Sequence, residues 1–183
     1  LQDIVPKLAD SADYAARRAE IDGFNRDGGM IRRGIALTPV KFGISFNTTF
    51  LNQAGALVHV YSDGSVHLNH GGTEMGQGLN TKVAQIVAHE FQVGFETVKI
   101  TATTTGKVPN TSATAASSGT DLNGMAAQAA ARTIKGRMRA HLAELHQCNP
   151  DSVTFTNGRV RAGAAEMSFA EAAKTCYLGR VSL

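Results

Sequence analysis

Cysteine is scarce in this chain of 183 residues. Its two cysteines, Cys148 and Cys176, lie far apart, with no CxxC pair and no Cys/His cluster around them. By themselves they therefore cannot hold an iron–sulfur cluster or a zinc ion. We expect two reduced thiols, which is typical of a cytoplasmic protein.

Long apolar runs are also absent. No stretch approaches the roughly 20 apolar residues of a membrane-spanning helix, and no charged and apolar leader like a secretory signal opens the sequence. We therefore expect no membrane association. The sequence begins at Leu1 without methionine and ends in LGRVSL, where a new strand would start. We expect it to be a piece of a longer chain.

Neither sign of charge dominates. Eighteen basic residues against fifteen acidic ones give a net charge of +3, and the basic residues are scattered. Those in residues 132–139 have no interleaved aromatic side chains of the kind on which bases stack. A solvated helix face explains them, so we expect no nucleic-acid partner.

The composition is that of an ordered globular domain, with 43% hydrophobic and 18% charged residues. A chain of this length suits one domain or one and a half. It can bury roughly 70% of its unfolded surface, so it needs no disulfide or metal to fold.

Two hairpins are expected from turn dipeptides between apolar runs. Asp63–Gly64 and Asn157–Gly158 can both supply the positive φ angles of tight turns. The flanking runs lie at residues 56–61, 66–69, 153–156 and 159–162. Further β-like segments lie at residues 32–45 and 97–103, the latter with alternating apolar and polar residues.

Helical spacing predicts amphipathic helices over residues 79–91 and 122–147. Shorter helices are expected within residues 1–22, ended by NRDGG, and over residues 169–176, opened by a capping box of Ser168 and Glu171. The expected buried stripe of the longest helix recurs at every fourth residue, with its basic residues outside. The stripe is Leu122, Ala126, Ala130, Ile134, Met138 and Leu142, and the basic residues are Arg132, Lys135 and Arg139.

These elements predict an α/β (α+β) fold with a mixed sheet, in which hairpins are packed by amphipathic helices. We expect residues 1–183 to form a single fragment of a larger domain. Its expected parts are an N-terminal helical segment (1–30), a core carrying the functional loops (31–147), and a C-terminal hairpin and helix (148–183).

Two loops of small residues each run into a helix. HGGTEMGQGLNTK spans residues 70–82, and PNTSATAASSGTDLNG spans residues 109–124. The first backbone N–H groups of a helix bind anions and hydrogen-bond acceptors. Gln77 adds an amide that donates and accepts at once, which suits the edge of a pterin or purine. Neither loop has the spacing of a P-loop or a dinucleotide fingerprint.

Simpler interpretations of both loops exist. The first can be a structural turn with Glu74 and Gln77 in solvent, and the second a Ser/Thr-rich turn capped by Thr120 or Asp121. His70, just before the first loop, is the one histidine worth testing as a functional group. His89–Glu90 is not an HExxH zinc motif, because position 93 is valine.

Three motifs together resemble the molybdopterin-binding part of the xanthine dehydrogenase family. They are GGTEMGQG (71–78), PNTSATAASSGTDLNG (109–124) and KFGISFNTTFLNQAGALVHVYSDGSVHLNH (41–70). The similarity covers nearly the whole chain, from RRAEIDGFN at residues 17–25 to the C-terminal SFAEAAKTCYLGRVSL.

The resemblance implies an oxidoreductase of purine catabolism that hydroxylates hypoxanthine and xanthine at a molybdenum centre. Electrons then pass through 2Fe-2S clusters to FAD and NAD, neither of which this chain would hold. The implied partners are the purine substrate, the rest of the molybdenum subunit, and the iron–sulfur/FAD subunit of an oligomeric enzyme.

The resemblance also assigns residues. The pyranopterin would be held by Met75, Gly76 and Gln77 and by Thr114, Ala115, Ala116, Ser117, Ser118 and Gly119. Ala116 would lie nearest the metal, where a larger side chain would fill the coordination space. Phe46 would be one of two rings that sandwich the purine, a geometry that offset stacking favours; without the family it reads as a core residue. Asn47 stands where the family usually has a threonine that touches the purine, so substrate preference is open.

Other parts of the family's active site have no counterpart here. These are the glutamate that activates the metal-bound oxygen, a further glycine-rich loop, and the Arg and Glu that bind the purine. We therefore expect no catalytic residue on this chain, and none of Glu74, Glu90 and Glu171 takes that role. The alternatives are an aldehyde oxidase-type molybdenum hydroxylase and a non-catalytic anion- or nucleotide-binding module.

Overall fold

The computed structural model describes residues 1–107 and 111–183. Internal contacts divide the chain into two units, Leu1–Gly43 and Ile44–Leu183. None of the described helices is both long enough and apolar enough to cross a membrane.

The first unit is a pair of helices followed by an extended segment. Helices α1 (Ile4–Ser11) and α2 (Tyr14–Arg26) confirm the predicted helical region and its break at NRDGG. The Asn25 side chain bonds the backbone N–H and carbonyl of Arg33 at 3.0 and 2.9 Å. The Arg33 guanidinium lies over the Phe24 ring, 4.0 Å from its centroid. These contacts hold the following segment against α2.

The strand predicted over residues 32–45 is wrong for the part of the chain described here. No described strand pairs with this segment, which carries no β assignment. An apolar extended sequence becomes a strand only when a neighbour satisfies its backbone N–H and C=O groups. Local composition alone therefore overpredicted this element.

The second unit contains a mixed sheet, as predicted. Strands β1 (Ala56–Val60) and β2 (Val66–His70) form the expected antiparallel hairpin, and β3 (Val98–Ile100) pairs parallel to β2. The connection from β2 to β3 runs through α3 (Leu79–Phe91), as the helical spacing predicted. Strand β3 is shorter than the predicted 97–103: a 3₁₀ turn (Phe95–Thr97) precedes it, and its pairing with β2 ends at Ile100.

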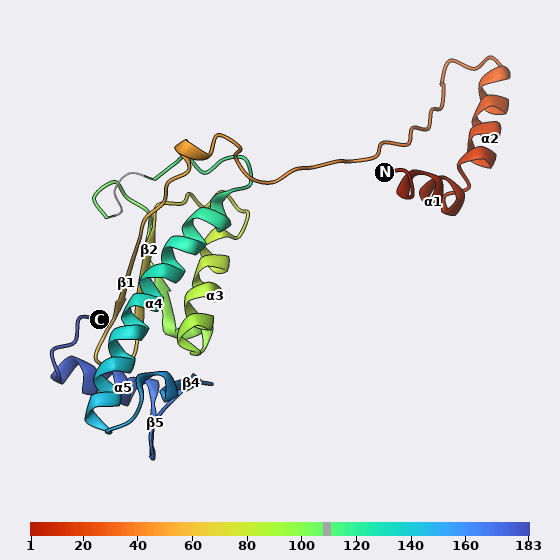
Figure 1. Ribbon diagram of the computed structural model, residues 1–183. Coiled ribbons are helices and arrows are strands. Elements are labelled where there is room, and N and C mark those ends of the chain that lie inside the picture. Colours follow the sequence, from red (N-terminus) through yellow and green to blue (C-terminus); the bar gives the residue numbers. More distant parts are fainter. Residues whose placement is uncertain (108–110) are drawn as a thin grey trace. The chain divides into compact units, whose positions relative to one another are not determined.

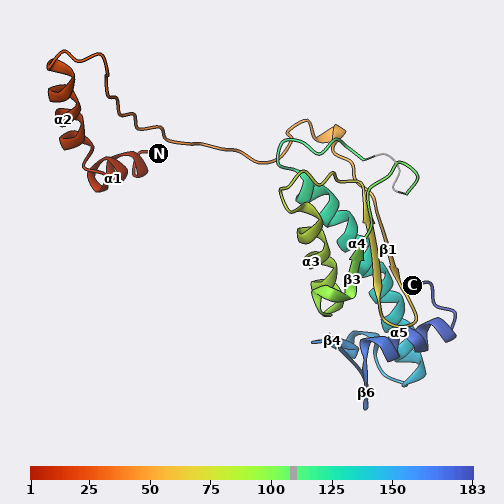
Figure 2. The ribbon, with the colours of Figure 1, turned by 180° about the vertical axis from the view of Figure 1, so that it is seen from behind.

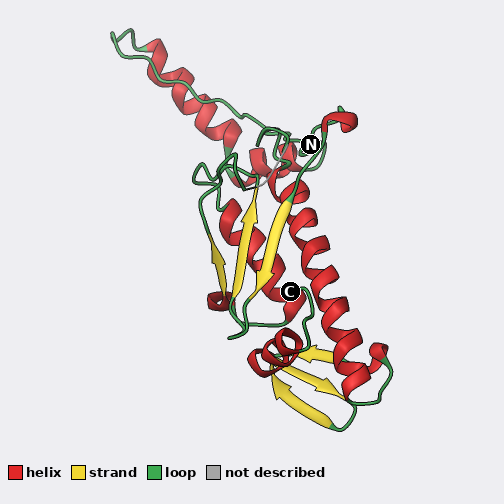
Figure 3. Cartoon of the chain, turned by 90° about the vertical axis from the view of Figure 1, so that its left-hand side faces the viewer, coloured by secondary structure: helices red, strands yellow, loops and turns green. Residues whose placement is uncertain are grey.

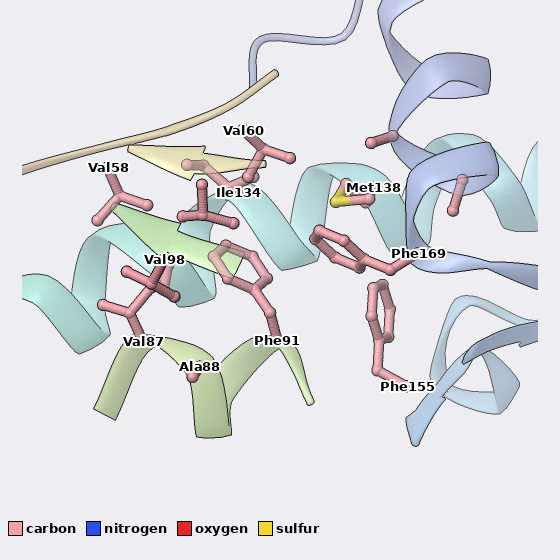
Figure 4. Close-up of a cluster of buried hydrophobic side chains, with 14 of the residues drawn as sticks. Val58, Val60, Val87, Ala88, Phe91, Val98, Ile134, Met138, Phe155 and Phe169 are labelled. Atoms are coloured by element: carbon pink, nitrogen blue, oxygen red, sulfur yellow. The ribbon is translucent and has the colours of Figure 1, made fainter. Parts of the chain in front are cut away.

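Helices α3 and α4 (Gly119–Leu145) lie side by side and cover one face of this sheet (Figures 1 and 2). Figure 4 shows the core between these helices and the sheet, which includes Val58, Val60, Val87, Phe91, Val98 and Ile134. The Phe169 ring lies 5.5 Å from Phe91 and 6.3 Å from Phe155, centroid to centroid. These rings join the core of the first sheet to that of a second, smaller one.

The second sheet is wholly antiparallel, with strands β4 (Thr154–Thr156), β5 (Arg159–Ala162) and β6 (Ala165–Ser168) (Figure 3). A 3₁₀ turn (Pro150–Ser152) precedes it, and α5 (Phe169–Leu178) follows. Asn157 and Gly158 have φ angles of 48° and 73°, which confirms the predicted turn. The capping box of α5 is also confirmed. Strand β6 was not predicted.

The predicted buried stripe of α4 is right in its second half and wrong in its first. Ile134, Met138 and Leu142 are buried, but in the N-terminal half Ala127 and Ala131 are the buried residues, while Leu122, Ala126 and Ala130 are only partly buried. Steps of four residues advance by 400°, so a strict i+4 series drifts about 40° per step around a helix of 3.6 residues per turn. Six such positions cannot share one face.

Both cysteines are free thiols, Cys148 half-buried and Cys176 buried. Burial raises the pKa of the Cys176 thiol to about 11. The protonated thiol therefore behaves as a small apolar core residue beside α4.

The turn of the first hairpin differs from the predicted one. Gly64 has a φ of +85°, while Asp63 has no positive φ. Instead, the Asp63 carboxylate accepts the backbone N–H of Ser65 at 2.9 Å. A Cβ at Gly64 would lie 2.8 Å from the Ala170 Cα, so both the backbone angle and the close approach of α5 require glycine here.

Gly64→Ala is expected to destabilise the chain by about 2 kcal/mol, through backbone strain and overlap with α5. Thermal unfolding would then show a melting temperature lower by about 5 °C. Gly136→Ala is the matched control, since Gly136 lies on α4 with open space around its Cβ position. There the same change should stabilise by about 0.5–1 kcal/mol. Equal shifts for both variants would contradict the role of Gly64.

A largely buried ion pair links the end of α3 to the middle of α4. The Glu90 and Lys135 side chains are 13% and 14% exposed, with 3.4 Å between Oε1 and Nζ. The Arg132 Nε lies 3.1 Å from the other Glu90 oxygen. Lys135 Nζ also lies 5.3 Å from the centroid of the Phe155 ring. The charge pattern predicted a solvated helix face for Lys135, and that prediction is wrong. Glu90 has a structural role.

Glu90→Gln should destabilise the chain by about 2 kcal/mol, less than the loss for a fully buried pair, because it leaves Lys135 without its counter-charge. Chemical denaturation would measure this. Glu166→Gln serves as the control, since Glu166 pairs with Arg159 and Arg161 in solvent, with its side chain 43% exposed. It should leave the unfolding midpoint nearly unchanged. A larger effect at Glu166 than at Glu90 would refute this assignment.

Candidate functional site

The two small-residue loops meet around one cavity of about 380 Å³. The Thr73 backbone N–H, in the first loop, donates to the Thr114 Oγ1 of the second at 2.8 Å. The cavity is lined by Met75, Gln77, Leu79, Lys82, Thr114, Ala115, Ala116, Ser117, Gly119 and Thr120. Residues 109–110, which open the second motif, lie outside the described residues. Two segments about forty positions apart thus form one concave surface.

The floor of this site is made by close backbone approach. A Cβ on Gly71 would overlap the Thr111 side chain, and one on Gly72 would lie 2.8 Å from the Asn123 Nδ2. The Thr103 hydroxyl lies 3.0 Å from the carbonyl oxygens of both His70 and Gly72. The first loop is therefore seated directly on the second loop and on α4.

His70 belongs to this floor. Its side chain is buried, and Nδ1 accepts the Gly72 backbone N–H at 3.1 Å. Burial lowers the pKa of the His70 imidazole, while Asn80 and the charge of Glu74 act in the opposite direction. A neutral ring that accepts at Nδ1 orients the start of the loop, which is a structural role.

Within the first loop, the Gln77 amide bonds the loop's own backbone. Its Oε1 accepts the Met75 N–H, and its Nε2 donates to the Thr73 carbonyl at 2.8 Å. A primary amide has two N–H groups and two lone pairs on its oxygen. Gln77 therefore keeps capacity for a ligand while it holds the turn. Met75 projects into solvent at the cavity, with 66% of its surface exposed.

Glu74 fills the N-terminus of α3. Its Oε1 accepts the backbone N–H groups of Gly76 and Gly78 at 2.9 and 3.0 Å, and its Oε2 accepts that of Asn80 at 2.9 Å. Bonds from these N–H groups, that of Asn80 first, lower the pKa of the Glu74 carboxyl. Glu74 is thus not simply solvated, as the simpler interpretation of the loop had it.

The second loop enters its helix, α4, with a different backbone geometry and no side-chain cap from its N-cap residue. Ala116 and Ser117 have φ angles of 52° and 56°, successive left-handed residues that are uncommon outside glycine and concentrate at functional sites. The N-cap residue of α4, Ser118, makes no side-chain capping bond in the described structure, and its Oγ donates to the Ala115 carbonyl at 2.8 Å. The first N–H groups of α4 are therefore not capped by Ser118.

Three lining residues, Leu79, Lys82 and Thr120, were not predicted as part of the site, and Lys82 is the charged one. Helical spacing placed it on the outer face of α3, and its side chain is indeed exposed. It nevertheless lines the cavity, since the second loop lies beside the first turn of α3. Its ammonium is the one side-chain charge among the described lining residues. A basic residue one turn into a helix that follows a glycine loop was the available signal.

A second, more apolar cavity of about 360 Å³ adjoins the first through Ala115, which lines both. Its lining includes Phe46, Leu51, Asn52, Ser112, Ala113 and Ser118. The Ser112 backbone N–H donates to the Gln53 carbonyl at 2.8 Å, and the Gln53 N–H donates to the Ser112 hydroxyl, also at 2.8 Å. Asn52 Nδ2 donates to the Phe46 carbonyl at 2.9 Å. The Phe46 ring, 37% exposed, is thus held beside the second loop.

Asn47 is not among the residues that line this cavity. It is exposed, and its carbonyl accepts the Thr49 N–H at 2.9 Å at the start of a 3₁₀ turn (Thr49–Leu51). The structure therefore brings together Phe46, Met75, Gln77 and residues 114–119, and leaves Asn47 at their margin.

Comparison with known proteins supplies a context for this geometry. Residues 7–183 match the family model of the molybdopterin cofactor-binding domain. The chain is 53% identical to xanthine dehydrogenase/oxidase of Mus musculus over 128 residues, which are 70% of this chain and 10% of that protein. It is 43% identical to xanthine dehydrogenase 2 of Arabidopsis thaliana over 183 residues, 100% of this chain and 12% of that protein. The chain thus spans about a tenth of the length of these curated relatives.

Solved structures agree on the fold, which confirms the α+β prediction. CO dehydrogenase from Oligotropha carboxidovorans matches with a TM-score of 0.61 at 25% identity, over 67% of this chain and 16% of that one. Quinoline 2-oxidoreductase from Pseudomonas putida 86 matches with a TM-score of 0.61 at 23% identity, over 69% of this chain and 16% of that one. The latter likeness concerns the fold alone.

Proposed function

The chain belongs to the molybdopterin cofactor-binding domain family, and from this premise we propose that it forms part of the pyranopterin pocket of a purine-oxidising molybdenum hydroxylase. The observation that carries the proposal is the meeting of two small-residue loops over one cavity, tied by the bond from Thr73 to Thr114. The relatives' names, xanthine dehydrogenase in animals and plants, support hypoxanthine and xanthine over aldehydes as substrates.

The residues present fit such a cofactor. A phosphorylated pterin needs hydrogen-bond donors and acceptors, positive potential for its anionic group, and little side-chain bulk. Lys82 supplies a positive charge, and residues 119–120 at the start of α4 bring backbone N–H groups to the cavity. Bulk is restricted, since a Cβ on Gly119 would already lie 3.3 Å from the Thr114 Cγ2. These features favour a cofactor pocket over a generic turn.

The roles of the residues follow from their placement. Met75, Gly76 and Gln77 would hydrogen-bond one edge of the pterin, and Thr114, Ala115, Ser117, Ser118 and Gly119 would hold it from the other side. When bound, the molybdenum cofactor supplies two-electron redox chemistry and a site at which oxygen from water reaches the substrate. Ala116 would leave room beside the metal. Phe46, in the adjoining cavity, would stack on the purine, with Asn47 at its rim.

The remaining parts of the proposed enzyme lie beyond these residues. We propose that electrons leave through 2Fe-2S clusters and FAD carried elsewhere, and that the rest of the molybdenum subunit supplies the catalytic glutamate. The complete enzyme would be an oligomer in the cytoplasm. On its own, this chain should bind no purine productively and should not oxidise xanthine. A domain division into residues 1–30, 31–147 and 148–183 remains part of this proposal.

The test compares the chain alone with the longer protein that contains it. The longer protein should contain molybdenum and a pterin in equal amounts and should oxidise xanthine, while the chain alone should show no turnover. Turnover of aldehydes but not of xanthine would favour the aldehyde oxidase-type alternative. A longer protein with neither pterin nor molybdenum, but with nucleotide or phosphate at these loops, would favour the non-catalytic module.

A further inference from the structure

We propose that Glu74 is a positioning residue whose carboxylate serves as a built-in anion at the α3 N-terminus. It would set the first loop for the ligand and keep the ligand's own anionic group away from α3, on the side of the cavity where Lys82 lies. The part that concerns the ligand rests on the function proposed above. The part that concerns α3 stands on the structure of the loop alone.

The backbone N–H groups at the starts of α3 and α4 have different acceptors. At α3, one carboxylate accepts three backbone N–H groups, those of Gly76, Gly78 and Asn80, at 2.9–3.0 Å. At α4, the N-cap Ser118 turns its hydroxyl back to the Ala115 carbonyl and caps nothing in the described structure. The first turn of α4 also carries an acidic residue, Asp121. The two helix starts therefore differ in which N–H groups a carboxylate binds: Glu74 accepts the N–H groups of the first loop, and Ser118 accepts none with its side chain.

Glu74 fixes the conformation of the first loop. Gly76 and Gly78 have φ angles of 93° and 76°. Because glycine tolerates many backbone conformations, these two residues alone do not fix the shape of the loop. A single carboxylate that binds both of their N–H groups and that of Asn80 selects one of these conformations. Gln77 completes the arrangement by bridging Met75 and Thr73. Met75 and Gln77 consequently lie at the cavity before any ligand arrives.

The charge of Glu74 also affects where an anionic group of the ligand can bind. An anionic ligand group that approached α3 would compete with Glu74 for the same N–H groups and would meet its negative charge. The same group at the second loop would meet Lys82 and the first turn of α4, both of which border the cavity. Glu74 therefore orients the ligand as well as shaping the loop.

The first experiment tests α3 without any cofactor. Glu74→Ala in the full chain should shift the NMR signals of the Gly76, Gly78 and Asn80 amides, and an excess of formate should move them back toward their wild-type positions. Formate is a carboxylate small enough to occupy the vacated place. Wild-type amides should not respond. If formate leaves these amides of Glu74→Ala unmoved, or moves the wild-type amides equally, the built-in anion is refuted.

The second experiment tests the consequence for the ligand, in the longer protein. Glu74→Ala should retain about tenfold less pterin than wild type, on the scale of one hydrogen-bonded charge, and formate during assembly should restore part of it. Glu171→Ala is the matched control, since Glu171 likewise binds a helix N-terminus but lies on α5. Equal losses for both variants, or no loss at Glu74, would refute the positioning role.

The two experiments separate this inference from the proposed function. If the wild-type protein holds no pterin, the proposed function fails, while the response of the amides to formate still decides whether Glu74 acts as the anion. If the protein holds pterin but formate has no effect on Glu74→Ala, the function stands and this inference fails.

Discussion

Replacing Ala116 by phenylalanine in the complete enzyme should abolish xanthine oxidation. Ala116 lies in the cavity wall with a φ of +52°. In the proposed function it is the residue beside the metal. A phenyl ring there would fill the space that the metal and its ligands need. It would also strain a left-handed backbone position. We expect at least a hundredfold loss of kcat, about 3 kcal/mol in activation free energy.

Steady-state kinetics on Ala116→Phe, with thermal unfolding to check the fold, make this measurement. Ala129→Phe is the matched control, since Ala129 is exposed on α4 away from the cavity. It should retain full activity. Wild-type turnover by Ala116→Phe would remove Ala116 from the neighbourhood of the metal. An equal loss in both variants would mean that a bulky side chain harms the enzyme without regard to the site, which would contradict the role of Ala116.

Reversing the charge of Lys82 should release the cofactor. Its ammonium lines the cavity beside the first turn of α4, where the pterin's anionic group is proposed to bind. Lys82→Glu would turn an attractive contact into a repulsive one. Since a hydrogen bond to a charged group is worth about 1.5–3 kcal/mol, we expect pterin content to fall at least about tenfold.

Pterin content is measured as the fluorescence of the oxidised pterin after denaturation, relative to protein. Lys174→Glu is the control, because Lys174 is equally exposed but lies on α5. Added salt should weaken cofactor retention in wild type more than in Lys82→Gln, because screening acts on the charge that the variant lacks. Normal pterin content in Lys82→Glu would show that this charge does not face the ligand.

Local patterns predicted the elements whose causes are local. The Asn157–Gly158 turn, the Ser168–Glu171 capping box and the α3 periodicity each depend on residues within a few positions of one another, and all are confirmed. The strand expected at residues 32–45 failed because pairing depends on a distant partner. Strand β6 was missed for a related reason, since its AEMS sequence has little β character and is held by β5.

The site was predictable in outline but not in its division of labour. Glycine content and small residues singled out both loops, and the cavity does lie between them. No spacing rule indicated that the Glu74 carboxylate would bind the N–H groups at the start of α3, because that depends on how the loop folds back on itself. Lys82 was assigned to solvent by its helical position, since a helical wheel ignores what a neighbouring loop brings close.

The most direct test of the central claim is a crystal structure of the longer protein with its cofactor. We expect pterin density within hydrogen-bonding distance of Gly76–Gln77 on one side and Ser117–Gly119 on the other, with the anionic group toward Lys82. Pterin density at any other place on the molecule would contradict it, as would an anionic group seated at the α3 N-terminus in place of Glu74.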